Sequence, residues 1–176
     1  MKWSKLKQSA ESLLADTLKG RIRYQVTKYC RGSSTSASRG WITFDGKELE
    51  NFPNEGYVYS SRYLMQRTNP TINEWQGTPA HSDLEHSDKF AQAEKLLDKD
   101  YLGAKDEFYL ALQTYILIPI DAALNSSNAI VRAIALFDRR CGKRRLGTLK
   151  PSPDAPSLVK ECFGIRCEAE GLSLSA

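Results

Sequence analysis

The hydrophobic pattern near the start of the chain changes from a helical period to a strand period, and this change limits the folds open to the chain. From Trp3 to Leu18, apolar residues recur at spacings of three, four and seven, which is typical of an amphipathic helix. From Ile22 to Val26, apolar and polar residues alternate, which indicates a half-buried strand. The sequence therefore predicts a helix over 3–18 followed directly by a strand.

A hairpin signal comes next, in the segment "WITFDGKELENF". Asp45 and Gly46 suit the two positive φ angles of a type I′ turn, so two further antiparallel strands are expected up to residue 52. Beyond them, a short helix is predicted around Tyr59 and Tyr63. The stretch 69–83 contains two prolines and a glycine and is expected to be a long loop.

The second half of the chain has helical periodicity. "KDEFYLALQTYI" is apolar nearly all round and carries two acids in its first turn, so we expect it to form a central buried helix. Asn128 is the expected N-cap of a helix that Gly142 ends, and Asp154 is the expected N-cap of a helix that stops before Gly171. The helices predicted in this half cover 87–101, 105–116, 119–124, 128–141 and 154–170.

These elements predict an α+β fold, in which an N-terminal helix and a three-stranded antiparallel sheet pack with a mainly helical C-terminal half. A chain of 176 residues suits one domain. We expect residues 1–176 to share one core, with a helix-plus-sheet unit over 1–68, the loop over 69–83 and a helical unit over 84–171.

Charge and cysteine usage favour a cytoplasmic protein. The net charge of +4 permits nucleic-acid contact without requiring it. The four cysteines form no C-x-x-C pair, and with only two histidines no metal site or cofactor is expected. We expect the thiols to be reduced and buried. No signal peptide and no membrane partner are expected, because no run approaches the ~20 apolar residues of a span.

Several segments resemble a known family. They are "MKWSKLK", "LKGRI", "WITFDGKEL", "DRRCGKRRLGTL" and "IRCEAEGL". Together they resemble a small family of bacterial cytoplasmic proteins that has no assigned activity, and the likeness is weakest over residues 53–105. The resemblance implies a bacterial, intracellular protein and transfers no functional residue. The order of helix, three strands and helix is also similar to that of double-stranded-RNA-binding domains, but the second predicted helix lacks their lysine cluster.

The segment "DRRCGKRRLGTLK", from Asp138 to Lys150, is the most basic part of the chain. Residues 132–150 hold seven Lys or Arg against one acid. On a helical wheel, Asp138 falls on the apolar side, so its carboxylate is expected to be partly buried beside a cationic partner. The rest of the segment has two interpretations: a solvated or internally paired cluster, or an anion site that holds phosphates. The anion-site candidates are Arg139, Arg140, Lys143, Arg144 and Arg145.

A second candidate site is aromatic. Trp75, in the long loop, is a candidate interface anchor that Tyr59 and Tyr63 would extend, and the alternative is a small apolar cluster under the loop. His81 and His86 match no metal motif, and no nucleophile elbow, P-loop or zincin motif is present.

Three functional hypotheses follow. The first is a non-enzymatic binding protein that engages a protein partner. The second is a nucleic-acid-associated protein that binds phosphates through the basic segment 139–150, with salt-dependent affinity. The third is an enzyme with an unrecognised site, and the lack of catalytic motifs makes it the least favoured. The sequence makes no prediction of the oligomeric state.

Overall fold

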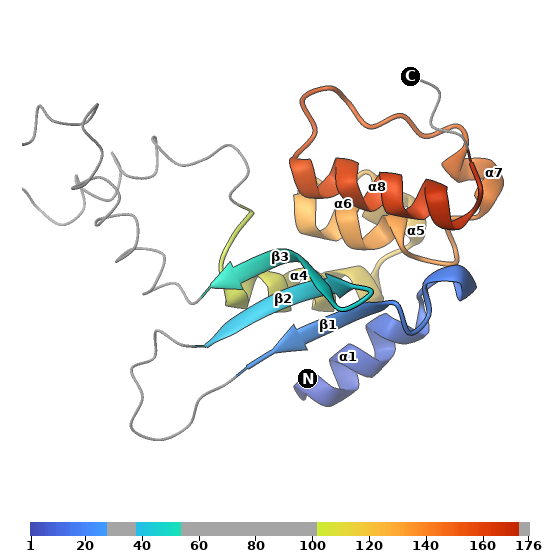
Figure 1. The fold of residues 1–176 in the computed structure, drawn as a ribbon. Helices are drawn as coiled ribbons and strands as arrows, with labels where there is room; N and C mark the ends of the chain where they lie inside the picture. The colour runs from blue at the N-terminus through green and yellow to red at the C-terminus, as the bar shows by residue number, and fades with distance from the viewer. Residues whose placement is uncertain (28–37, 54–101, 173–176) are drawn as a thin grey trace, which may run out of the picture.

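Three antiparallel strands form a sheet in the order β1 (Ile22–Val26), β2 (Arg39–Phe44) and β3 (Lys47–Pro53). The computed structural model describes residues 1–27, 38–53 and 102–172. Helix α1 (Trp3–Ser12) and a short 3-10 turn, η1 (Asp16–Leu18), precede the sheet. The helices α4 (Lys105–Leu117), α5 (Ile120–Leu124), α6 (Ala129–Leu136), α7 (Lys143–Leu146) and α8 (Ser157–Ala169) follow it. The predicted α+β fold, with its mainly helical C-terminal half, is confirmed (Figure 1).

The predicted hairpin is present with the predicted turn. Asp45 and Gly46 have φ angles of 48° and 81°, as a type I′ turn requires, and Phe44 pairs with Lys47 across it. Arg21 donates to the Asp45 carboxylate from Nη2 at 2.7 Å and so ties the turn to the residue before β1. The register shifts between Ile42 and Thr43, where β3 carries an extra residue.

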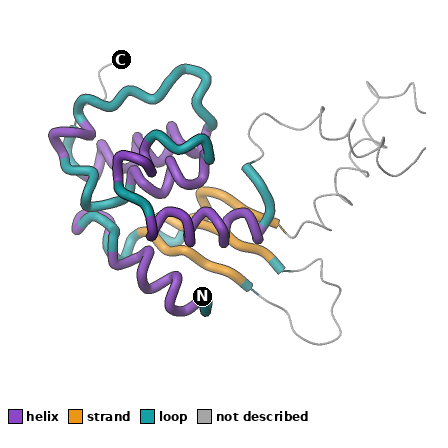
Figure 2. The backbone as a smooth tube through the Cα atoms, turned by 180° about the vertical axis from the view of Figure 1, so that it is seen from behind, coloured by secondary structure: helices purple, strands orange, loops and turns teal. Residues whose placement is uncertain are grey.

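One face of the sheet carries the core. Tyr24 and Ile42 are fully buried on this face, and α4 lies across it, as the view from behind shows (Figure 2). Phe108 of α4 stacks on Phe52 with ring centroids 4.5 Å apart. Gly40 permits this approach, because a Cβ there would lie 2.6 Å from the Phe108 ring. α1 packs beside α4 and β1.

The C-terminal helices pack on one another and on α4. α6 lies between α4, α5 and α8, and α8 also contacts η1 near the N-terminus (Figure 1). The predicted N-cap of α6 is confirmed, since the Asn128 Oδ1 accepts hydrogen bonds from the amides of Ile130 and Val131. The short helix predicted after Pro119 is also present.

Two predicted helices end earlier than expected, for a single reason. α1 stops at Ser12 instead of residue 18, and α6 stops at Leu136 instead of Cys141. The two segments that follow pair with each other: the Ala15 amide donates to the Phe137 carbonyl, and the Arg139 amide donates to the Leu13 carbonyl, both at 2.8 Å. This strand-like pairing replaces the last helical turns.

Three more predictions need correction in the C-terminal half. Gly142 does not end a helix but precedes the one-turn helix α7, so the basic residues do not lie at the end of α6. The N-cap of α8 is Pro156 and not Asp154. α4 is buried on one side only, because Leu110 and Leu117 are exposed. The predicted C-terminal end before Gly171 is confirmed.

The other predicted elements lie outside the described residues. They are the short helix around Tyr59 and Tyr63, the loop 69–83 and the helix 87–101. Among the described helices, none has the length and apolar character that crossing a membrane would require.

Candidate functional site

The outer side of α4 exposes large apolar side chains. Leu110 is 59% exposed and Leu117 is 77% exposed. They lie seven residues apart, so they occupy one stripe on the helix side opposite the buried Phe108 and Tyr115. Met1, which is 54% exposed, is the other large apolar residue of the described ranges that is exposed to this degree.

Met1 lies against α4. The Tyr109 hydroxyl donates a hydrogen bond to the Met1 carbonyl, which fixes the start of the chain against α4. Trp3 packs on Tyr109 with ring centroids 6.1 Å apart. Because α1 packs beside α4, we group the exposed residues of these two segments as the α1–α4 face, defined as Met1, Lys2, Lys5, Leu110 and Leu117.

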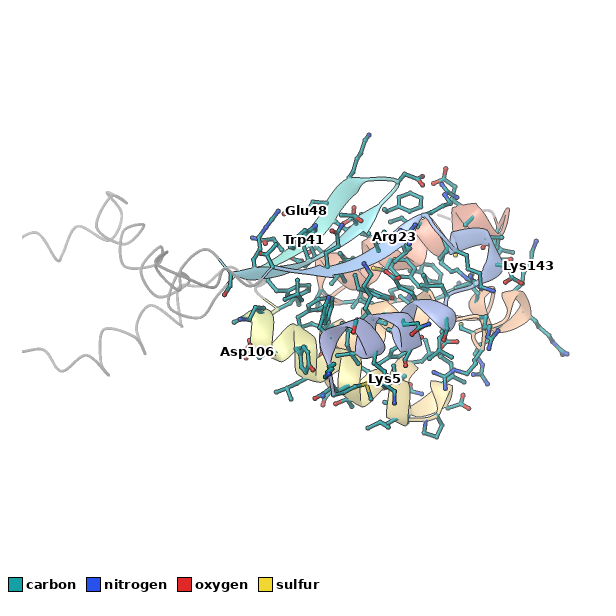
Figure 3. The ribbon with its side chains drawn as sticks, turned by 90° about the horizontal axis from the view of Figure 1, so that it is seen from below. Lys5, Arg23, Trp41, Glu48, Asp106 and Lys143 are labelled. Carbon is teal, nitrogen blue, oxygen red and sulfur yellow. The ribbon has the colours of Figure 1, made fainter. Side chains whose placement is uncertain are left out.

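Lysines contribute the polar part of the α1–α4 face. Lys2 and Lys5 are exposed, and neither makes an ion pair within the described part of the chain. Figure 3 shows Lys5 on the side of the molecule formed by α1 and α4, away from the side where Trp41 projects from the sheet. Positive charge and exposed apolar surface thus occur together on this side.

The open side of the sheet has a different character. The Arg39 guanidinium lies over the Trp41 ring, 4.4 Å from its centroid, and its Nη1 donates to the Glu48 carboxylate at 2.7 Å. Figure 3 shows Trp41 and Glu48 together on this side. Since Arg39 covers the face of the Trp41 ring and is itself paired with Glu48, these side chains have their partners within the fold.

Three of the five anion-site candidates are held by neighbouring groups. Arg140 pairs with Asp138 at 2.6 Å, and Arg145 pairs with Asp121 at 3.0 Å. The Lys143 ammonium donates to the Glu170 carbonyl at 2.6 Å, at the C-terminal end of α8. Most of this segment therefore contributes to the fold.

Arg139 and Arg144 are the two candidates that remain exposed without an ion pair among the described residues. Arg139 follows the paired segment near Leu13, and Arg144 is in α7. Two separate guanidinium groups provide fewer free positive charges for binding an anion than the five-residue cluster that the sequence suggested.

Asp138 is a charged residue that is fully buried in the described part of the molecule. Its side chain is fully buried and accepts hydrogen bonds from the Tyr115 hydroxyl at 2.7 Å, from Arg140 Nε at 2.8 Å and from the Arg140 amide at 2.7 Å. The hydrogen bond to Asp138 raises the pKa of Arg140. Burial, and then the Asp138 charge, raise the pKa of Tyr115, so this tyrosine stays a neutral donor.

The burial and the cationic partner predicted for Asp138 are confirmed, although the residue lies beyond the end of α6. Since Asp138 is fully buried and its hydrogen bonds are made to Tyr115 and Arg140, we interpret this cluster as structural. It joins α4, the segment after α6 and the N-terminal segment at Leu14.

The thiols also serve the fold. Cys141, Cys162 and Cys167 are free and buried, as predicted, and Cys30 lies outside the described residues. Burial raises the pKa of all three thiols, which keeps them protonated. In the described ranges, no group of histidine, cysteine and acidic side chains is arranged to hold a metal ion.

Comparison with known protein families matches residues 2–167 to the SF0329 protein family. The chain belongs to the SF0329 protein family. No curated protein and no solved structure matches it. Membership in the SF0329 family agrees with the resemblance seen in the sequence, and it names no activity.

The aromatic interface predicted for this SF0329 chain stays a prediction. Trp75, Tyr59 and Tyr63 lie outside the described residues, as do His81 and His86. Sequence reasoning missed the exposure of Leu110 and Leu117, although the apolar character of this segment on nearly all sides pointed to it. A helix that is apolar nearly all round is either buried or faces a partner, and only the first alternative was considered for α4.

Proposed function

We propose that this chain is a non-enzymatic binding protein whose α1–α4 face docks a segment of a partner protein. The observation that carries the proposal is the exposure of Leu110 and Leu117 on one stripe of α4. Contiguous exposed apolar surface on a folded protein is typical of interaction sites, whereas isolated exposed leucines are common. Here the two leucines lie on one side of α4, two turns apart, and Met1 is held against the same helix by Tyr109.

The charge of this face indicates the chemistry of the partner. Lys2 and Lys5 are exposed beside the apolar stripe and have no carboxylate partner among the described residues. A complementary segment would carry apolar side chains for Leu110 and Leu117 and Asp or Glu side chains for the lysines. An amphipathic acidic helix meets both requirements.

The nucleic-acid hypothesis has weaker support. Phosphate binding through residues 139–150 needs several free cations on one surface. Instead, Arg140 pairs with Asp138, Lys143 donates to the Glu170 carbonyl, and Arg145 pairs with Asp121.

The proposed cellular location is the bacterial cytoplasm. The free, buried thiols support this location, since disulfides are rare there.

Photo-crosslinking in cells tests the proposal. The photoreactive residue p-benzoyl-phenylalanine is placed at position 117 in one variant and at position 144 in another, and the adducts are identified by mass spectrometry. We expect position 117 to yield a protein adduct whose crosslinked peptide combines acidic and apolar residues. Combining Lys2→Glu with Lys5→Glu should reduce this adduct strongly, because the charge complementarity is reversed.

Position 144 serves as the matched control, since Arg144 is exposed but lies outside the α1–α4 face. A nucleic-acid adduct at position 144, with no protein adduct at position 117, would support the alternative hypothesis. An adduct between two copies of the chain, or one that the charge reversal does not change, would contradict the proposed partner.

A further inference from the structure

A cavity of about 420 Å³ opens between α6 and α8, away from the α1–α4 face. The loop from Leu149 to Ala155 passes over it, and the end of α5 at Leu124 closes one side. Figure 1 shows this loop arching above α8 and α6 before the chain enters α8. The volume lies within the range of about 300–1,000 Å³ that small-molecule sites occupy.

The walls are built from two helical stripes that face each other. Arg132 and Leu136 are four residues apart on α6, and Val159 and Phe163 are four residues apart on α8. The apolar part of the lining consists mainly of Leu124, Leu136, Leu149, Val159 and Phe163. A ligand in this cavity would therefore bury an apolar body.

Arg132 is a partly buried polar group of this site that lacks a protein partner among the described residues. Its Nε is buried and has no hydrogen-bond partner, and Arg132 joins no ion pair within the described ranges. Nη1 and Nη2 are not among the buried atoms, so these are the groups that an acceptor in the cavity can pair with, and the partial burial of Arg132 strengthens such a pair relative to one at the open surface. The planar guanidinium matches a carboxylate, which can accept two parallel hydrogen bonds.

We propose that this cavity binds a small organic acid, whose apolar body lies between α6 and α8 and whose carboxylate pairs with Arg132. The other charged residues of the lining are Lys150 and Asp154, both exposed, and their charges offset each other. Arg132 therefore supplies the net charge of the site, which suits a monoanion better than a phosphate dianion. The site is independent of the proposed protein partner.

Calorimetric titration of the full chain with sodium octanoate at pH 7 tests this proposal. We expect saturable binding at one site. Octan-1-ol, which keeps the apolar body but lacks the charge, should bind about tenfold more weakly or worse, because the ion pair with Arg132 is lost. Octyl phosphate should bind no better than octanoate.

Variants locate the binding in this cavity. Arg132→Gln should weaken octanoate binding by about tenfold or more. The matched control, Arg144→Gln, removes the same charge from an exposed position outside the cavity and should leave the affinity unchanged. Ala155→Phe places a ring into the cavity and should abolish binding, which provides a second route if Arg132→Gln does not fold.

Three results would overturn the assignment. The first is no octanoate binding to the folded wild-type chain. The second is equal binding of octanoate and octan-1-ol, which would remove the role of Arg132. The third is tighter binding of octyl phosphate, which would replace the carboxylate by a different ligand class.

Discussion

Two buried tyrosines differ in whether the hydroxyl group has a hydrogen-bond partner. Tyr24 and Tyr115 are both fully buried. The Tyr115 hydroxyl donates to the buried carboxylate of Asp138 at 2.7 Å. The Tyr24 hydroxyl has no partner among the described residues. The same side chain is therefore satisfied at one position and unsatisfied at the other.

Replacing each tyrosine by phenylalanine should destabilise the protein at Tyr115 but not at Tyr24. Tyr115→Phe removes a hydrogen bond to a charged acceptor and should lower the free energy of unfolding by about 1.5–3 kcal/mol. Tyr24→Phe removes a buried hydroxyl without a partner and should leave that free energy unchanged or raise it by up to ~1 kcal/mol. Urea denaturation of both variants measures the difference. Equal destabilisation by the two changes would contradict this account.

Asp138 shows how far residue-level reasoning reaches from sequence alone. Its position among apolar neighbours predicted a buried carboxylate with a cationic partner, and both features are confirmed. The helical wheel used for that prediction did not apply, because Asp138 lies after α6. In the structure, the burial and one of the donors come from contacts that are distant in the sequence, with the segment at Leu14 and with Tyr115 of α4.

At the scale of elements, α6 depends on its N-cap. The Asn128 side chain accepts from the Ile130 amide at 2.9 Å and from the Val131 amide at 3.1 Å. Asn128→Ala should lower the free energy of unfolding by about 1 kcal/mol, because two helical amides lose their acceptor.

Asn128→Asp provides the rescue, since its carboxylate accepts the same hydrogen bonds and suits the positive end of the helix dipole. Asn125→Ala is a second control. Asn125 is exposed and lies just beyond α5, and its side chain donates one hydrogen bond to the Asp121 carbonyl. Both controls are measured by urea denaturation. A loss for Asn125→Ala as large as that for Asn128→Ala would show that the cap is not the cause.

Features that depend on residues close together in the sequence could be predicted, whereas features that depend on contacts between distant residues could not. The hairpin and the cap of α6 depend on residues within a few positions of each other, so Asp45, Gly46 and Asn128 were sufficient. The ends of α1 and α6 depend on the pairing of Leu14 with Asp138, which the periodicity of either segment does not contain. The exposure of Leu117 was missed for a different reason, because the apolar character of α4 was interpreted only as burial in the core.

At the scale of the whole molecule, buried acidic protons should make the fold sensitive to alkaline pH. Burial raises the pKa of the Cys162 thiol well above its usual value, and burial likewise raises those of Tyr24 and Tyr115. The unfolded chain therefore releases these protons at lower pH than the folded chain. Above about pH 9, the free energy of unfolding should fall as pH rises.

Urea denaturation between pH 7 and pH 10.5 measures this dependence. Each fully titrated group contributes a slope of about 1.4 kcal/mol per pH unit above its unfolded pKa. Tyr24→Phe removes one such group and should reduce the slope above about pH 10. A stability that is constant from pH 8 to pH 10.5 would contradict the role of these buried groups.

Hydrogen bonds between the N-terminal segment and the C-terminal helical half predict cooperative unfolding. The Leu13–Ala15 segment is hydrogen-bonded to Phe137 and Arg139, and the Thr17 hydroxyl donates to Glu170 at 3.1 Å. The N-terminal segment thus completes the helical half. If residues 1–176 form one domain, as the sequence predicts, both halves should unfold in a single transition.

Tryptophan fluorescence and far-UV circular dichroism can follow the two halves separately. In a Trp75→Phe background, Trp3 and Trp41 report on the N-terminal helix and sheet, while the dichroism is dominated by the C-terminal helices. The two urea curves should coincide. Asp138→Ala should shift both by the same amount, about 1–3 kcal/mol, because it leaves the buried Tyr115 hydroxyl without its acceptor. If only the dichroism curve moved, the sheet would fold independently of the helices, and the single-domain prediction would be wrong.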